Sequence, residues 1–357
     1  MILRLRSDAG FTLAELLIAT GLLLVVSSIV TSAIVQITNQ QQTIWNRTEM
    51  HSGVRGATEL LQQEVGQAGR IALPNPVTSA AINIGPGPFS ACVQVNNVQL
   101  FTTAAGANPT DGMWFDPVTT TGVSLTWLDG NNAETVPVNG VIDTVGHTIS
   151  GCFWSNHVAN APVVVRGAFA NGIVPPSPPS LLPNGSDANH LKLFGDINSD
   201  GKMVYVEYIC DNGDIPGLPD PVASHNLYRN TMKYDWNLVT DGPKPSVDNS
   251  KILLTNVHTN PADAGGVARP CFQYQTSTLK VQGVDFTFVT DVAVTLTVWT
   301  QSVDPLTKKY QQETKALLNV SPRNVFFAWE LAGIGYTDHI QSTPGTITSL
   351  VAVVQSP

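Results

Sequence analysis

Charged residues are scarce in this chain of 357 residues, and the basic ones are scarcer than the acidic ones. Lys and Arg together number 18, against 27 Asp and Glu, and the formal net charge is −9. No run of more than two Lys or Arg occurs anywhere in the sequence. A nucleic-acid-binding surface needs clustered cations to neutralise phosphates, so we expect no nucleic acid among the partners of this protein.

The common catalytic and nucleotide-binding motifs are also missing. The sequence contains no HExxH, GxSxG, GxGxxG or P-loop pattern, and its seven His are scattered without a close pair. No feature of the sequence selects a nucleophile together with its base. We therefore expect a protein that is not an enzyme and that binds no cofactor, apart from the calcium motif described below.

Cysteine is rare, and its spacing argues against the usual metal and redox motifs. The four Cys form no CxxC pair, which a zinc ribbon or a thioredoxin-type site would need. Outside the cytoplasm two disulfides are the natural interpretation, and four buried free thiols are the alternative. Three pairings are possible and the spacing does not choose among them. Pairing neighbours in chain order gives, as a working hypothesis, Cys92–Cys152 and Cys210–Cys271.

One long apolar run is present, within residues 11–37. Arg4 and Arg6 precede it, Glu15 is its only charge, and residues 16–37 carry none. This segment is long enough for a helix to span a hydrocarbon core. The basic residues before it predict a cytoplasmic N-terminus and a translocated remainder. A secretory signal peptide has a shorter apolar part, and a plain signal anchor does not account for a carboxylate in the apolar helix.

The heptapeptide GFTLAEL at residues 10–16 resembles the class III signal of type IV prepilins. The resemblance implies cleavage between Gly10 and Phe11 by a prepilin peptidase, followed by N-methylation of Phe11. It also implies that Glu15 of one subunit neutralises the α-amine of a neighbour in the assembled helical bundle. The chain departs from many major pilins in having no Pro before Pro74, so the partial melting of that helix is not carried over.

The helix is expected to continue beyond the apolar span. Gly66 and Gly69 weaken its end, and Pro74 and Pro76 stop it. Before that end, apolar residues recur at steps of three and four and form one stripe that would pack on a sheet. The stripe consists of Val54, Ala57, Leu61, Val65 and Ala68.

After Pro74 the sequence changes to a β pattern, rich in Val, Thr, Tyr and Phe and broken by Gly, Asn, Asp and Pro. A final stretch, 346–354, is expected to add one more strand. The pieces VYVEY at 204–208 and VSPRN at 320–324 resemble PilW-like minor pilins. The other predicted strands include residues 123–128, 163–165, 191–194, 203–210, 284–290, 292–300 and 314–320.

The predicted fold is α+β: one long N-terminal helix, membrane-spanning in its first half, packed on a mainly antiparallel β-sheet domain. The expected organisation has four parts. They are a leader peptide at 1–10, a transmembrane part of the helix at 11–37, an extramembrane part at 38–70 and a β-rich periplasmic or extracellular domain at 71–357.

One internal segment fits the calcium-loop pattern D-x-[DN]-x-[DN]-G-x5-E. An alternative is a simple hairpin turn between two strands. In that case an extended strand would carry Glu207 away from Asp200 at ~3.3 Å per residue. If calcium binds, four side chains and one main-chain carbonyl would supply its oxygens: Asp196, Asn198, Asp200, Glu207 and, through its carbonyl, Lys202.

Together these patterns predict a minor type IV pilin, a structural subunit that helps to initiate or cap a pilus. A minor pseudopilin of type II secretion, similar to the J subunit, is the alternative from the same superfamily, and a pilus-tip adhesin is the alternative from a different class. The expected partners are a prepilin peptidase, other minor and major pilins, and the inner membrane. The expected location is a single pass through the inner membrane, then the pilus or cell surface.

Overall fold

The computed structural model describes residues 12–355 except for 74–75, 106–107, 111–112, 114, 117–120, 140–144, 181, 213–224, 268 and 282. The chain forms two compact units. The first unit consists of Met1–Ser52 and Trp299–Glu313, and the second of Gly53–Val298 and Thr314–Pro357. The expected α+β class is confirmed, because one long apolar N-terminal helix is followed by mostly antiparallel sheets.

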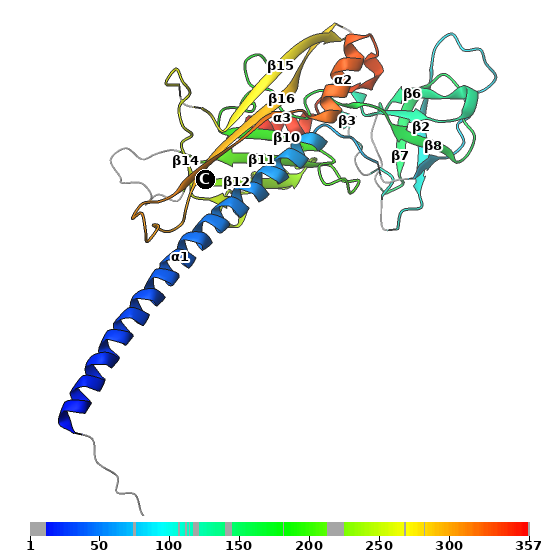
Figure 1. The fold of residues 1–357 in the computed structure, drawn as a ribbon. Helices are drawn as coiled ribbons and strands as arrows, with labels where there is room; N and C mark the ends of the chain where they lie inside the picture. The colour runs from blue at the N-terminus through cyan, green and yellow to red at the C-terminus, as the bar shows by residue number, and fades with distance from the viewer. Residues whose placement is uncertain are drawn as a thin grey trace, which may run out of the picture. The chain divides into compact units, whose positions relative to one another are not determined.

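The N-terminal helix α1 runs without a break over Leu13–Gln67, which is 55 residues (Figure 1). It contains no Pro, and it continues through its internal glycines Gly21, Gly53, Gly56 and Gly66. Within the second unit the predicted stripe is confirmed: Val54, Ala57, Leu61, Val65 and Ala68 are all buried. The helix is therefore longer than an average globular helix, and its last turns are held by tertiary packing.

A six-stranded sheet follows α1 in the chain and has the order β6-β5-β8-β1-β2-β7. Its core side chains include Trp127, whose ring meets that of Phe153 edge-on at 4.9 Å between centroids. The indole N–H of Trp127 donates to the Ser79 hydroxyl at 2.9 Å, so this fully buried ring is also satisfied as a donor. The strands are β1 Val77–Ser79, β2 Val93–Thr102, β5 Ser124–Trp127, β6 Glu134–Pro137, β7 Thr148–Phe153 and β8 Ala161–Val165.

A second sheet has the order β10-β11-β12-β13 and receives the last turns of α1. Both of its inner strands carry nearly continuous buried residues, as expected of strands covered on two faces. The predicted strands at 191–194 and 203–210 are confirmed here as an antiparallel hairpin. The members are β10 His190–Gly195, β11 Val204–Cys210, β12 Asn226–Lys233 and β13 Ile252–Thr255.

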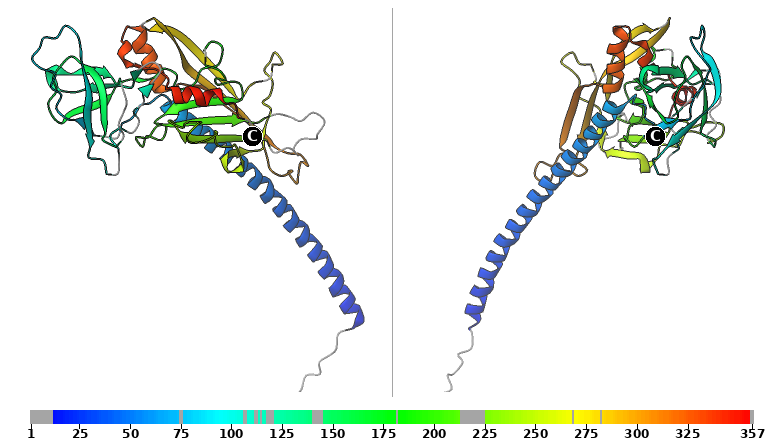
Figure 2. Two further views of the ribbon diagram at one scale, coloured as in Figure 1. Left: turned by 180° about the vertical axis from the view of Figure 1, so that it is seen from behind. Right: turned by 90° about the vertical axis from the view of Figure 1, so that its right-hand side faces the viewer.

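The third sheet is built around β16, Val284–Trp299 (Figure 2). The expected strands at 284–290 and 292–300 are one strand, because no Gly or Pro separates them. A bulge in β16 places Thr290 as an extra residue opposite the step from Gln275 to Thr276, and the pairing continues on both sides of it. The neighbours of β16 are β14 Val257–His258, β15 Phe272–Val281 and β17 Gln312–Val320.

The C-terminal region is helical, and the strand expected at 346–354 is wrong. Helix α3 occupies Gly345–Ala352 and begins after Pro344. Its buried residues Ile347, Leu350 and Val351 follow helical spacing, and they join the large core cluster. The apolar run was too short for its period to be recognised from sequence. Helix α2, Arg323–Gly333, precedes α3.

The remaining elements are short. Two-residue strands form a parallel pair, β9 Ala168–Phe169 with β18 Ile340–Gln341, and an antiparallel pair, β3 Phe115–Asp116 with β4 Thr121–Gly122. Single 3-10 turns lie at Gly130–Asn132, Asn249–Lys251 and Thr337–His339.

Candidate functional site: the two ends of helix α1

The first turn of α1 holds the acidic residue of the prepilin-like motif. The backbone N–H and the hydroxyl of Thr12 both donate to Glu15 Oε2 at 3.0 Å, and the N–H of Glu15 donates back to the Thr12 hydroxyl at 3.3 Å. This reciprocal arrangement is a capping box, which satisfies N–H groups that the helix itself leaves unpaired. Gly10 and Phe11 lie outside the described residues.

The N-terminal half of α1 presents apolar side chains to every side. Leu22, Leu23, Leu24 and Val25 are each more than half exposed, although successive side chains point about 100° apart around the helix. Among the described residues, α1 is the one helix long and apolar enough to cross a membrane. A helix that is apolar all round needs an apolar environment.

The C-terminal half of α1 is anchored to the second sheet by a buried polar cluster. Glu64 accepts hydrogen bonds from Arg229 Nε at 3.0 and 3.1 Å and from the Tyr208 hydroxyl at 2.5 Å. Arg229 also donates to the Thr231 hydroxyl at 2.7 Å. Burial, together with the charge of Glu64 beside it, raises the pKa of Tyr208, so the phenol stays protonated as a donor. The cluster fixes both the register and the rotation of α1 on the sheet.

The end of α1 depends on glycine. Gly69 has φ +76°, and a Cβ on it would lie 2.7 Å from a Val325 methyl group. Gly172 approaches so closely that its own Cβ would lie 2.1 Å from the Gly69 Cα. Asn324, from the piece that resembles minor pilins, donates its amide to the Gln67 carbonyl at 3.3 Å and so caps the helix.

The calcium motif is divided between two environments. Asp196 is fully buried, accepts the Asp200 N–H at 3.0 Å and lies 3.6 Å from Arg70 Nε. Burial raises the pKa of Asp196 despite the charge of Arg70. Asp200 accepts the Lys202 N–H at 3.0 Å within the turn that joins β10 to β11.

Glu207, the last residue of the motif, lies on β11 and is fully buried with two lysines. Lys244 Nζ donates to one of its oxygens at 2.6 Å, and Lys192 Nζ lies 3.5 Å from the other. The structure thus does not bring Glu207 together with Asp196 and Asp200. The described residues contain no group of three or more His, Cys, Asp or Glu that could hold a metal. Calcium binding by the turn, with Asn198 as a further ligand, stays a prediction.

The Glu207 cluster has a structural role that sequence reasoning missed. Lys244 also donates to the Val353 carbonyl at 2.9 Å, and Lys192 to the Asn184 carbonyl at 2.6 Å. Desolvation lowers the pKa of Lys244 even beside Glu207. The cluster therefore ties the segment after α3 to the second sheet. A signal was present, because Lys192 and Glu207 interrupt otherwise apolar strands where a charge needs a partner.

All four cysteines are paired, and the pairing follows chain order. Cys92 and Cys152 form one disulfide, and Cys210 and Cys271 form the other, so the working hypothesis is confirmed. Each bond closes a long loop of about sixty residues. In the chain-entropy model, a disulfide stabilises the folded state more when the loop that it closes is longer. Disulfides persist in oxidising compartments.

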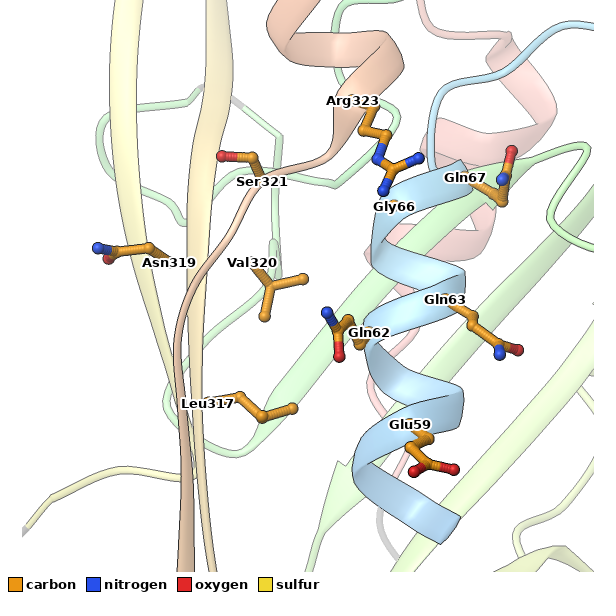
Figure 3. A pocket seen from close by; sticks show the side chains of 10 residues that line it. All are labelled: Glu59, Gln62, Gln63, Gly66, Gln67, Leu317, Asn319, Val320, Ser321 and Arg323. Carbon is orange, nitrogen blue, oxygen red and sulfur yellow. The ribbon is translucent and has the colours of Figure 1, made fainter. Parts of the chain in front are cut away.

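A groove of about 570 Å³ lies between the last turns of α1 and strand β17, inside the second unit (Figure 3). Side-chain amides dominate it, and Arg323 reaches over the last turn of α1 near Gly66. Its acid, Glu59, is already paired with Arg55 at 2.7 Å. The lining suits hydrogen bonding rather than acid–base chemistry. It consists of Glu59, Gln62, Gln63, Gly66, Gln67, Leu317, Asn319, Val320, Ser321 and Arg323.

Comparison with known proteins adds no relative: no protein-family model, no curated protein and no solved structure matches this chain.

Proposed function

We propose that the protein is a type IV prepilin-like subunit, a minor pilin that helps to initiate or cap pilus assembly. The observation that carries the proposal is the order of features at the N-terminus. A basic leader, the GFTLAEL motif with Glu15, a long apolar run and an uninterrupted helix follow one another in a single segment.

Two properties of the described chain support the anchored, extracytoplasmic part of this proposal. The apolar side chains of the first half of α1 are exposed in the single chain, which costs free energy in water and none in lipid. The β-rich region carries two disulfides, which fit an oxidising compartment.

In the proposed mechanism Glu15 changes partners on assembly. In the single chain its carboxylate is occupied by Thr12 in the capping box. Cleavage after Gly10 would create a charged α-amine on Phe11, and in a helical bundle the amine of one subunit would face Glu15 of the next. An ion pair in an apolar surrounding is favoured over either charge alone, so correct register between subunits is selected.

The β-rich region supports a minor rather than a major role. Its described residues form three sheets of four or more strands and two disulfides, and a head of this size fits an end of a filament better than a repeating shaft. A minor pseudopilin of type II secretion would use the same helix in the same way.

Processing is tested by the variant Gly10→Lys, which should block cleavage because the peptidase must accommodate a small residue before Phe11. Intact-mass measurement of the membrane-extracted protein should give a mature wild-type N-terminus at Phe11 and an uncleaved variant. A wild-type protein that starts at Met1, or at any residue after Phe11, contradicts the prepilin proposal.

The role of Glu15 is tested by two substitutions that separate charge from capping. Glu15→Leu removes both, whereas Glu15→Gln retains a good capping-box residue and removes only the charge. If the charge pairs subunits, both variants insert and are cleaved, but both fail to co-purify with the other minor subunits, and pilus numbers fall in electron micrographs. Normal assembly of the Gln variant alone would assign Glu15 to helix capping instead.

A further inference from the structure

The first unit contains a hairpin loop that follows α1 back toward its apolar half. His51 pairs with Glu313, Arg47 donates to the side chain of Gln311, and Asn46 donates to the Ser302 carbonyl at 3.4 Å. The helix partner thus moves from residue 51 to residue 46 as the loop advances toward its tip.

Asp304 continues this series at the tip. Its carboxylate is buried and hydrogen-bonded to the side chain of Thr43 and to the N–H groups of Leu306 and Thr307, at 2.7 and 3.0 Å. The loop, which joins β16 to β17, lies beside α1 in the right-hand view of Figure 2.

The level of this tip along α1 corresponds to a membrane surface. Thr43 follows Ile37, the end of the apolar run, by six residues, which is ~9 Å of helix at 1.5 Å per residue. The headgroup layer of a bilayer is of similar thickness, about 5–8 Å on each side. Trp45, at the same level, is 72% exposed, and Trp is enriched at membrane interfaces.

The exposed side chains of the tip are either apolar or positively charged. Leu306 is 57% and Val303 is 39% exposed, and the adjacent Lys308 and Lys309 are both exposed. The acid of the tip, Asp304, is withdrawn into internal hydrogen bonds. A local positive surface therefore occurs in a chain whose net charge is −9. Apolar side chains beside lysines are what a surface lying on anionic lipid headgroups requires.

We infer that the hairpin tip, residues 303–310, is a second membrane-contacting surface that binds the headgroups of anionic phospholipids beside the point where α1 leaves the bilayer. The inference rests on the membrane anchoring in the proposed function but not on pilus assembly. Lys308 and Lys309 supply the attraction, and Leu306 enters the boundary between headgroups and acyl chains.

The experiment is hydrogen exchange on the full-length chain in nanodiscs of phosphatidylcholine alone or with phosphatidylglycerol. Amides of 303–310 should exchange on the order of tenfold more slowly in the anionic discs, as two lysines near such a surface would give. Lys308→Glu/Lys309→Glu should abolish the difference. Arg269→Glu/Lys280→Glu changes the net charge equally at exposed positions of the second unit and should preserve the difference between the two lipids.

Two results would overturn the inference and point to a protein neighbour instead. The amides of 303–310 could exchange at the same rate in both lipids, or they could stay equally slow in the Lys308→Glu/Lys309→Glu variant. Resistance of the chain to alkaline carbonate extraction is measured on the same samples. Extraction of the chain by carbonate would contradict the proposed membrane anchoring. If the chain resists extraction but the exchange of its tip is the same in both lipids, only the present inference is contradicted. The unassembled Glu15→Leu variant should still show slower exchange of 303–310 in anionic discs. This result would separate lipid binding by the tip from pilus assembly.

Discussion

The two halves of α1 share one backbone geometry and differ in what surrounds them. Leu23, in the first half, is 65% exposed, whereas Leu61, in the second half, is fully buried. The first half is apolar on all sides and carries one acid, while the second is apolar along a single stripe and polar elsewhere. One continuous helix can therefore suit two different surroundings along its length. The distribution of apolar residues around the helix axis indicates which surroundings each half needs.

The largest expected effect concerns the polar anchor of the packed half. Arg229→Met leaves Glu64 buried without its cation and should lower the free energy of unfolding by about 3–5 kcal/mol. Urea unfolding of the full-length protein in mild detergent measures this. Glu64→Gln/Arg229→Met, which removes both charges, should recover most of the loss. A single variant as stable as the wild type would show that the cluster does not hold α1 on the sheet.

The second prediction compares the effect of the same Leu→Ala substitution on stability in the two halves of α1. Leu61→Ala empties a fully buried position and should cost about 2–5 kcal/mol. Leu23→Ala should leave the unfolding of the β-rich region unchanged, because its side chain is 65% exposed and belongs to the other compact unit. Equal destabilisation by the two variants, measured under the same detergent and urea conditions, would abolish the proposed distinction.

A glycine pair provides a third and smaller contrast. Gly69→Ala meets a positive φ and a Val325 methyl group and should destabilise by about 1–3 kcal/mol. Gly21 has no atom within 4 Å of an added Cβ, so Gly21→Ala should be neutral for domain stability and favourable for helix formation. Thermal unfolding midpoints of the two variants test this, and a neutral Gly69→Ala would mean that the helix end is less tightly held than described.

The smallest effect is electrostatic and pH-dependent, and it concerns β10 in the second sheet, on which the last turns of α1 pack. The hydrogen bond that the His190 ring donates to the Asp187 carboxylate raises the pKa of His190. Burial acts to raise the pKa of Asp187, but hydrogen bonds from His190 and Asn189 outweigh it and the pKa falls.

A raised His190 pKa means stabilisation that is complete below about pH 6.5 and lost as the pH rises through the folded-state value. A lowered Asp187 pKa means stabilisation present above about pH 3.8 and lost in acid. His190→Gln should therefore cost less than about 1 kcal/mol at pH 5.5 and still less at pH 8.5. A larger loss at pH 8.5 than at pH 5.5, in urea unfolding, would reverse the assigned sign.

Several elements were predictable because they depend on local pattern. The stripe from Val54 to Ala68 repeats at helical spacing, and it is buried as expected. The hairpin of β10 and β11 was visible as two apolar runs around a turn. The pairing of Cys92 with Cys152 was only a choice by chain order, and the β2–β7 pairing that brings these residues close is a long-range contact.

Other features were not predictable, since their partners lie far away in sequence. Helix α3 cannot be distinguished from a strand in the sequence, because its apolar run is too short to show a period, and its contacts with the core decide its form. Glu207 fits a calcium motif in sequence, yet Lys244, from a distant segment, occupies its carboxylate in the fold.

The sequence by itself determined the long helix, its division into an all-apolar half and a striped half, and the β character of the rest, because these depend on composition and periodicity over neighbouring residues. Only the tertiary structure decided which charges are buried together, where the helix is pinned and how the C-terminal segment folds. The reason is physical: a buried charge or a short apolar run has no preferred state of its own, and its state is set by the partners that folding brings to it.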